Sequence, residues 1–136
     1  MSIFIASDHA GFKLKQHLCN QRNLIDLGTD SEDSCDYPIF AKKLVHSITN
    51  SDQGILVCGT GIGMSIVANR FEHIRAALCF TPEMAALARQ HNDANVLVLG
   101  ARIISPETAD SILKKFLSTS FEGGRHQRRV NLINNK

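Results

Sequence analysis

Short runs of β-branched and apolar residues alternate along this chain with segments whose apolar residues recur every three or four positions. The first pattern indicates strands and the second one-sided helices. The expected strands are residues 3–6, 24–27, 55–58, 74–79 and 96–99. Strands that alternate with helices form parallel sheets, and right-handed crossovers place the helices on both faces. The sequence therefore predicts a Rossmann-like α/β fold, a three-layer α/β/α domain with a five-stranded parallel sheet.

Helix starts are marked at Thr81-Pro82 and Ser105-Pro106, where a hydroxyl can cap free amides and proline suits the first helical position. A length of 136 residues fits one domain, and neither an internal repeat nor a linker interrupts the pattern. We expect residues 1–136 to form a single domain.

The composition narrows the classes of protein that the chain can belong to. Its four cysteines are widely separated and include no CxxC pair, which favours a reducing compartment and neither a disulfide framework nor a zinc site. No signal-like leader or membrane-length apolar run is present. We expect a cytoplasmic protein without metal or cofactor.

The positive charge is concentrated near the C-terminus. A net charge of +2 is too small to indicate nucleic acid, but the last sixteen residues contain four cations, Arg125, Arg128, Arg129 and Lys136. They could bind a phosphate group, or they could form a solvated, frayed tail.

Two loops follow expected strands and contain unusual residues. Ser7-Asp8-His9-Ala10-Gly11 follows the first strand, and Cys58-Gly59-Thr60-Gly61-Ile62-Gly63-Met64-Ser65 follows the strand at 55–58. Ligands of open α/β sheets lie outside the carboxyl ends of the strands. If these strands are neighbours, both loops line one crevice.

The second loop places three glycines within five residues before an expected helix, 64–69. Its amides can converge on an anion, although a tight turn without a ligand is about equally compatible with glycines alone. The dinucleotide fingerprint requires glycine at Met64, a Walker loop requires a Gly-Lys pair, and a cysteine phosphatase loop requires arginine at Met64. All three motifs are excluded.

Three side chains in these loops can move protons. Cys58 faces the amino end of a helix, which favours a thiolate base, although most strand cysteines only fill a core. Asp8 and His9 can transfer a proton or bind phosphate, and a helix cap followed by a surface histidine is the plainer interpretation.

His91-Asn92-Asp93 lies between a helix and the last strand, at the amino edge of the sheet and opposite the proposed crevice. One chain does not easily bring both together. If His91 is catalytic, we expect it to come from a second subunit, with the active site at a homodimer interface. The C-terminal segment, about 121–136, would cross with it and bring Arg125 and Arg129.

The chain closely resembles type B ribose-5-phosphate isomerase, in the family that includes allose- and galactose-6-phosphate isomerases. The resemblance covers nearly the whole length and rests on six blocks in order: SDHAGF (7–12), DYP (36–38), CGTGIG (58–63), RQHND (89–93), GAR (100–102) and EGGRHQ (122–127). Relative to the family, the region 23–28 looks shortened, which affects the sheet edge rather than the crevice.

The resemblance implies a role for each residue of the reaction centre. Cys58, with Thr60 beside it, would shuttle the proton between C2 and C1 of the sugar. Family members have either this cysteine or a glutamate further along the loop, and this chain resembles the cysteine subtype. The amides of the loop from Gly59 through Gly61 and Ile62 to Gly63 would hold the enediolate oxygen. Asp8 would move the hydroxyl proton, and His91 would open the furanose ring.

The resemblance also implies the residues that bind the substrate. Guanidinium groups match phosphate oxygens geometrically. The binding residues would be His9, Arg125 and Arg129 for the phosphate, Arg102 as a further contact, Tyr37 at the pocket wall and Asn92 at the reacting end. Members of the family form dimers or tetramers with shared sites.

We therefore expect an aldose-ketose isomerase that interconverts D-ribose 5-phosphate and D-ribulose 5-phosphate, a step of the non-oxidative pentose phosphate pathway. A hexose-6-phosphate isomerase, for allose or galactose, is a close alternative because the sequence does not give the depth of the pocket. A non-catalytic sugar-phosphate sensor is a further alternative, and Cys58 and His91 argue against it. An RNA-binding domain ranks last, since no aromatic surface interleaves with the basic tail.

Overall fold

The computed structural model describes residues 1–135, and Lys136 of the basic tail lies outside the described residues. Its five strands are β1 (Ile3–Ser7), β2 (Ile25–Asp26), β3 (Gln53–Cys58), β4 (Ala76–Leu78) and β5 (Val96–Gly100). All the strand pairs are parallel, and the strand order is β2-β1-β3-β5-β4. The predicted five-stranded parallel sheet is confirmed.

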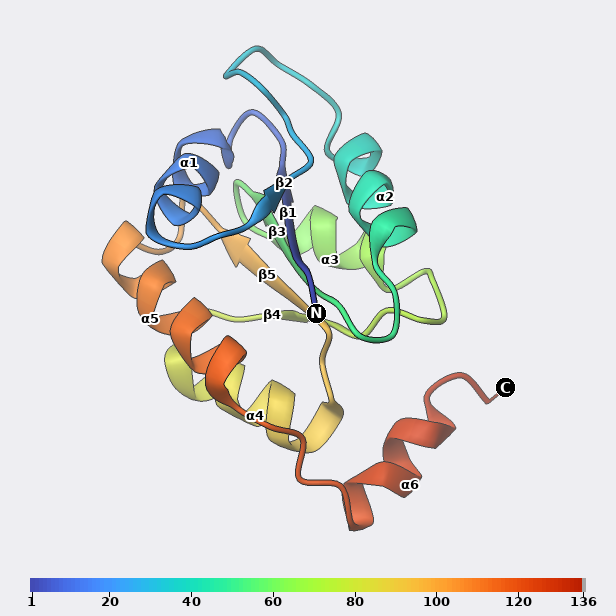
Figure 1. Cartoon of the computed structure of the whole chain (residues 1–136). Helices are drawn as coiled ribbons and strands as arrows, with labels where there is room; N and C mark the ends of the chain where they lie inside the picture. Colours follow the sequence, from blue (N-terminus) through green and yellow to red (C-terminus); the bar gives the residue numbers. More distant parts are fainter. Residues whose placement is uncertain (136) are drawn as a thin grey trace.

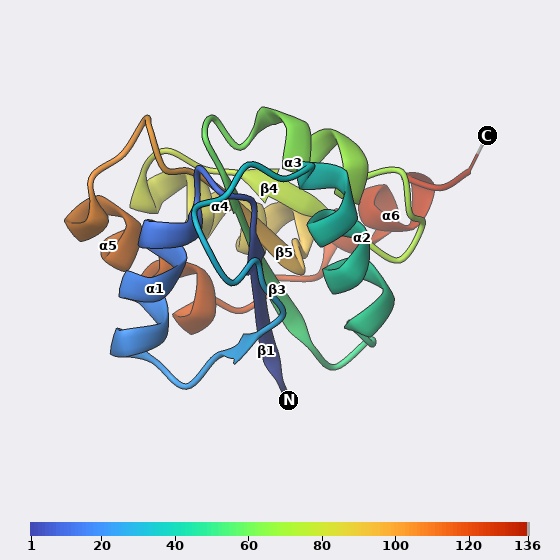
Figure 2. The ribbon, with the colours of Figure 1, turned by 90° about the horizontal axis from the view of Figure 1, so that it is seen from above.

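Helices cover both faces of this sheet, as Figures 1 and 2 show. The helices are α1 (Phe12–Gln21), α2 (Tyr37–Ser47), α3 (Ile62–Ala68), α4 (Pro82–Asn92), α5 (Pro106–Ser118) and α6 (Arg125–Leu132). Apolar side chains of α1, α4 and α5 pack on one face, and those of α2 and α3 pack on the other. The three-layer arrangement is confirmed.

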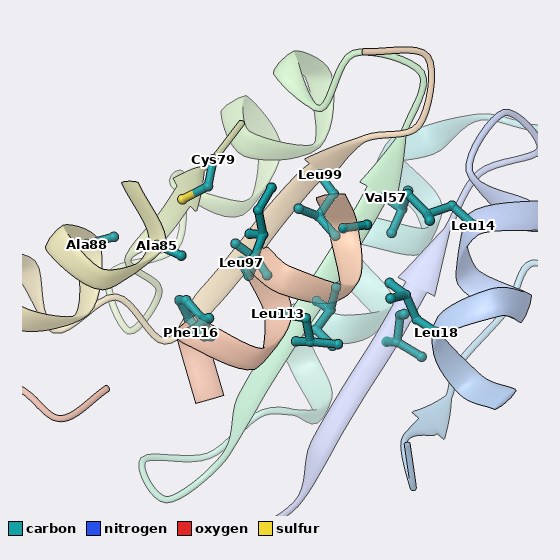
Figure 3. Packing of buried hydrophobic residues seen from close by; sticks show 14 of the residues in the cluster. Leu14, Leu18, Val57, Cys79, Ala85, Ala88, Leu97, Leu99, Leu113 and Phe116 are labelled. Atoms are coloured by element: carbon teal, nitrogen blue, oxygen red, sulfur yellow. The ribbon is translucent and has the colours of Figure 1, made fainter. Parts of the chain in front are cut away.

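Successive side chains of a central strand point alternately to the two faces of the sheet. In β3, Ile55 and Val57 belong to the cluster under α1 and α5, whereas Leu56 and Cys58 point toward α2 and α3. Figure 3 shows the first cluster, where Leu14 of α1 lies beside Val57 and Leu18 lies further along the same helix. Since Cys58 is the last residue of β3, this alternation sends its side chain to the α2–α3 side of the carboxyl edge.

Both predicted helix caps are present. The Thr81 hydroxyl accepts from the Met84 amide at 3.2 Å, and the Ser105 hydroxyl accepts from the Thr108 amide at 3.1 Å. None of the helices in residues 1–135 has the length and apolar character needed to span a lipid bilayer.

The structure differs from the sequence prediction mainly at the periphery. β4 is shorter than predicted, and its three residues are only partly buried because it is an edge strand. The helix expected at 64–69 begins earlier, at Ile62. The basic segment forms α6 rather than a frayed tail, and Asn134 after it donates to the Glu72 carbonyl at 2.8 Å.

Candidate active site

An open cleft of about 470 Å³ lies at the carboxyl edge of the sheet. β1 and β3 pair over their full common length, so the loops that follow them lie side by side, as the sequence predicted. The loop after β5 completes the wall. The lining residues are Asp8, His9, Ala10, Tyr37, Cys58, Gly59, Thr60, Ile62, Gly63, Ile66 and Arg102.

Cys58 lies at the floor of this cleft. The last position of β3 leaves the residue only 5% exposed, yet it lines the opening. Its Sγ accepts a hydrogen bond from the Gly61 amide at 3.2 Å. An amide N–H aimed at sulfur stabilises negative charge there, which suits a thiolate that removes a proton from carbon.

The glycine loop turns sharply from β3 into α3. Gly61 has φ +81°, a conformation that costs a residue with a side chain about 1–2 kcal/mol. Its amide is committed to Cys58, and the Ile62 amide donates to the Thr60 hydroxyl at 3.2 Å. Within residues 1–135, the amides of Gly59, Thr60 and Gly63 donate to no backbone group. Of the five loop amides expected to bind an oxyanion, these three therefore remain free to donate to one.

Asp8 is held by the start of the first helix. It is 7% exposed, its amide donates to the Val57 carbonyl at 3.2 Å, and its Oδ1 accepts from the Gly11 amide at 3.0 Å. The N-cap of α1 is Gly11 and carries no side-chain cap, so Asp8 closes the turn before the helix and is not the helix cap that the plainer interpretation expected. The same carboxyl lines the cleft. This contact occupies only Oδ1, so Oδ2 remains able to accept a hydrogen bond from a group in the cleft.

His9 has a defined proton arrangement in its neutral form. Its Nδ1 lies 3.2 Å from the Cys35 amide nitrogen, which can only donate. Nδ1 is therefore the acceptor, and Nε2 keeps the hydrogen as a donor for an anion in the cleft. Cys35 was not singled out in the sequence, because its contribution is a backbone group that no side-chain pattern reveals.

Arg102 and Tyr37 line the cleft, each beside a glycine that leaves room for it. The Arg102 amide donates to the Gly59 carbonyl at 2.9 Å, and a Cβ on Gly59 would lie 2.9 Å from Arg102 Nη1. A Cβ on Gly63 would lie 2.5 Å from the Tyr37 ring. The two glycines are thus needed for close packing as well as for their amides.

Two lining residues, Ala10 and Ile66, were not among the predicted site residues. Ile66 lies one helical turn beyond Ile62 on α3, and both side chains are about half exposed, at 52% and 53%. Helical spacing from the glycine loop is the signal that could have identified Ile66.

The remaining predicted residues lie elsewhere. His91 and Asn92 end α4, at the amino edge of the sheet, and Asn92 lines a separate cavity of about 330 Å³. Arg125 and Arg129 project from α6, which Figure 1 shows on the far side of the sheet from the loops after β1 and β3. One chain therefore does not bring His91, Asn92, Arg125 and Arg129 together with Cys58.

Nearly the whole chain matches a known family of enzymes. Residues 3–133 match the family described as Ribose/Galactose Isomerase. The chain belongs to the ribose/galactose isomerase family. The resemblance seen in the sequence is confirmed, and the protein is a sugar-phosphate isomerase.

Individual members of the family match along nearly their whole length. Ribose-5-phosphate isomerase B of Escherichia coli is 45% identical, over 96% of this chain and 93% of the relative. The crystal structure of a ribose 5-phosphate isomerase from Thermotoga maritima is 54% identical with a TM-score of 0.95, over 99% of this chain and 98% of that one. The Mycoplasma genitalium isomerase B, with bound ribulose 5-phosphate, is 44% identical with a TM-score of 0.85, over 97% and 93% of the two chains.

Proposed function

We propose that this isomerase interconverts D-ribose 5-phosphate and D-ribulose 5-phosphate without a metal or cofactor. The observation that carries the proposal is Cys58, a buried thiol at the floor of an open cleft, with an amide at its sulfur and the Asp8 carboxyl among the lining groups. The named relatives above are ribose-5-phosphate isomerases, which supports a pentose phosphate over a hexose phosphate.

The reaction follows from the groups that line the cleft. The Cys58 thiolate removes the proton from C2 of the open-chain aldose, and the electrons move to O1 to form a cis-enediolate. Amides of Gly59, Thr60 and Gly63 stabilise the developing negative charge. Asp8 carries the hydroxyl proton from O2 to O1, and Cys58 returns its proton to C1. This gives the ketose with no net change in atoms or electrons.

Binding the phosphate group of the substrate requires cations, and only some of the proposed phosphate-binding residues lie in the cleft. His9 Nε2–H and Arg102 lie in the cleft, and Arg125 and Arg129 lie on α6 at the opposite edge. We infer that a second copy brings its amino edge, with His91, Asn92 and these arginines, to the cleft of the first copy. His91 then protonates the ring oxygen and opens the furanose.

An exposed apolar surface near the sheet edge supports pairing of two chains as a homodimer or a dimer of dimers. β4 is an edge strand, and the neighbouring segments expose large apolar side chains between 37% and 53%: Ile62, Ile66, Phe80, Met84 and Leu87. A second copy would cover apolar area that a monomer leaves in water.

Ketose formation from ribose 5-phosphate, with allose 6-phosphate and galactose 6-phosphate in parallel and with and without chelator, tests the proposed reaction. We expect chelator-insensitive formation of ribulose 5-phosphate, reduced on the order of 10³-fold in Cys58→Ala with binding retained. Arg129→Ala should instead raise KM about 10-fold. Activity on a hexose phosphate alone would change the substrate, and no activity on any of the three would support a sensor.

Mixing two inactive variants tests the shared site. Cys58→Ala and His91→Ala chains, refolded together, should recover about a quarter of wild-type activity, because half of the dimers are mixed and each mixed dimer has one intact site. No recovery on mixing would show that each chain completes its own site.

A further inference from the structure

His91 is held by the face of its ring rather than by its nitrogens. The ring stacks on His126 of α6, with centroids 4.5 Å apart and planes 15° from parallel. No hydrogen bond to a nitrogen of His91 is present within residues 1–135. The nitrogens of an imidazole bond in the ring plane, so a stacked neighbour restrains the orientation of His91 and leaves both nitrogens available to exchange protons.

His126 is itself anchored. It is 8% exposed, and its Nε2 lies 3.4 Å from Oε1 of Glu122, four residues earlier in the segment before α6. The Glu122 amide donates to the carbonyl of Gln90 at 3.1 Å, and Gln90 immediately precedes His91. The segment before α6 is therefore tied to the end of α4, which keeps His126 close to the ring of His91.

The same three side chains have the composition of a metal site, which the geometry argues against. Ligand atoms of His91, Glu122 and His126 lie within 4.8 Å of one another, and two histidines with a glutamate form a familiar zinc ligand set. A metal would have to lie in the plane of both rings, however, and planes only 15° apart do not converge on a common point between them. The contact is a stack and not a chelate.

We propose that His126, fixed by Glu122, is a positioning residue that holds His91 in the orientation needed to protonate the ring oxygen of the furanose. This inference rests on the proposed function of His91. It assigns to His126 and Glu122 a part in ring opening and none in the proton transfer at carbon.

Replacement of the stacked ring tests the proposal. His126→Ala removes the ring, whereas His126→Phe retains a flat stacking surface without nitrogens. We expect kcat for ribose 5-phosphate to fall about 10–100-fold in His126→Ala with KM changed less than about 3-fold, because a small misplacement of an acid has effects of that size. His126→Phe should recover most of the loss, and Glu122→Gln should lie between the two.

The kcat–KM split separates positioning from a general loosening of α6. Arg125 and Arg129 lie on the same helix, so loosening would weaken phosphate binding and raise KM. Gln127→Ala is the matched control, because among residues 1–135 Gln127 Nε2 donates only to Asn131 Oδ1, at 2.8 Å on the exposed side of α6. This variant should retain wild-type kinetics. A rise in KM alone for His126→Ala, or no recovery in His126→Phe, would overturn the proposal.

A partial reaction that needs no ring opening gives an independent readout. Ribulose 5-phosphate cannot close to a furanose, because its O5 carries the phosphate. Exchange of its C1 protons in D₂O, followed by NMR, should therefore continue at the wild-type rate in His126→Ala and His91→Ala and stop in Cys58→Ala. Equal loss of exchange and isomerisation in His126→Ala would refute a role confined to ring opening. Full activity of His91→Ala on ribose 5-phosphate would instead refute the proposed role of His91.

Discussion

Gly61 combines two constraints, and its replacement by alanine has an effect that can be worked out from the structure. Its φ of +81° disfavours any side chain by about 1–2 kcal/mol. An added Cβ would also lie 2.4 Å from Leu78 Cδ1 and 3.2 Å from the carbonyl carbon of Leu99. Overpacking of this kind typically costs about 1–3 kcal/mol. Together the two effects should lower the free energy of unfolding by about 2–5 kcal/mol.

Gly123→Ala is a matched control for the backbone contribution alone. Gly123 has φ +68°, and an added Cβ there would meet no atom within 4 Å. Urea unfolding followed by circular dichroism should therefore show a loss of at most about 1–2 kcal/mol for Gly123→Ala and about 1–3 kcal/mol more for Gly61→Ala. Equal losses would refute the clash with Leu78 and Leu99, and a loss below about 1 kcal/mol in Gly61→Ala would refute both contributions.

Gly61→Ala should also reduce the rate of catalysis. The Gly61 amide donates to Cys58 Sγ, so a displaced loop also displaces this donor. We expect kcat of folded Gly61→Ala to fall about 10-fold or more, whereas Gly123→Ala should lose less. An unchanged kcat would show that the amide does not assist the thiolate.

Three further predictions concern single side chains. Arg102→Ala should raise KM about 10-fold with a smaller effect on kcat, measured by steady-state kinetics, if Arg102 contacts the phosphate as proposed; an unchanged KM would contradict this role. Lys15 is fully buried with Nζ 2.7 Å from Asp26 Oδ2, so Lys15→Ala should lose about 3 kcal/mol in urea unfolding and the volume-conserving Lys15→Met about half as much. Burial raises the pKa of the Cys79 thiol from 9.0 to about 11. Because the folded state favours the protonated thiol, Cys79 contributes to the free energy of unfolding below pH 9.0, and this contribution is lost as the pH rises toward about 11. Over this pH range Cys79→Ala should therefore lose less stability than the unsubstituted chain.

The central strands and the loops after them were predictable from the sequence because their residues are constrained on both faces. β3 and β5 are almost entirely buried and read as unbroken apolar runs. The position of β5 between β3 and β4 was not predictable, since a right-handed crossover can reach either side of a growing sheet. α6 has only Val130 and Leu132 as large apolar residues, too few for a helical pattern, and forms against other elements.

The candidate site was predictable where the pairing of neighbouring strands brings residues together. Asp8 follows β1 and Cys58 ends β3, so the pairing of these two strands brings both residues to one cleft. The stack of His91 on His126 depends on how the chain returns from α5 to the end of α4, a path that no local pattern contains. The tautomer of His9 depends on the Cys35 amide, which lies 26 residues away in the chain.

Cys58 and His91 lie at opposite edges of the sheet, and the proposed sharing of a site between two chains would make turnover depend on protein concentration. For a site shared between two chains, dilution below the dissociation constant of the pair would separate each thiol from the acid it works with. Turnover per chain would then decline in dilute solution. Added Cys58→Ala chains, inactive on their own, would restore this turnover, because each still provides His91 and the α6 arginines to the cleft of its partner. A dead subunit would behave as an activator.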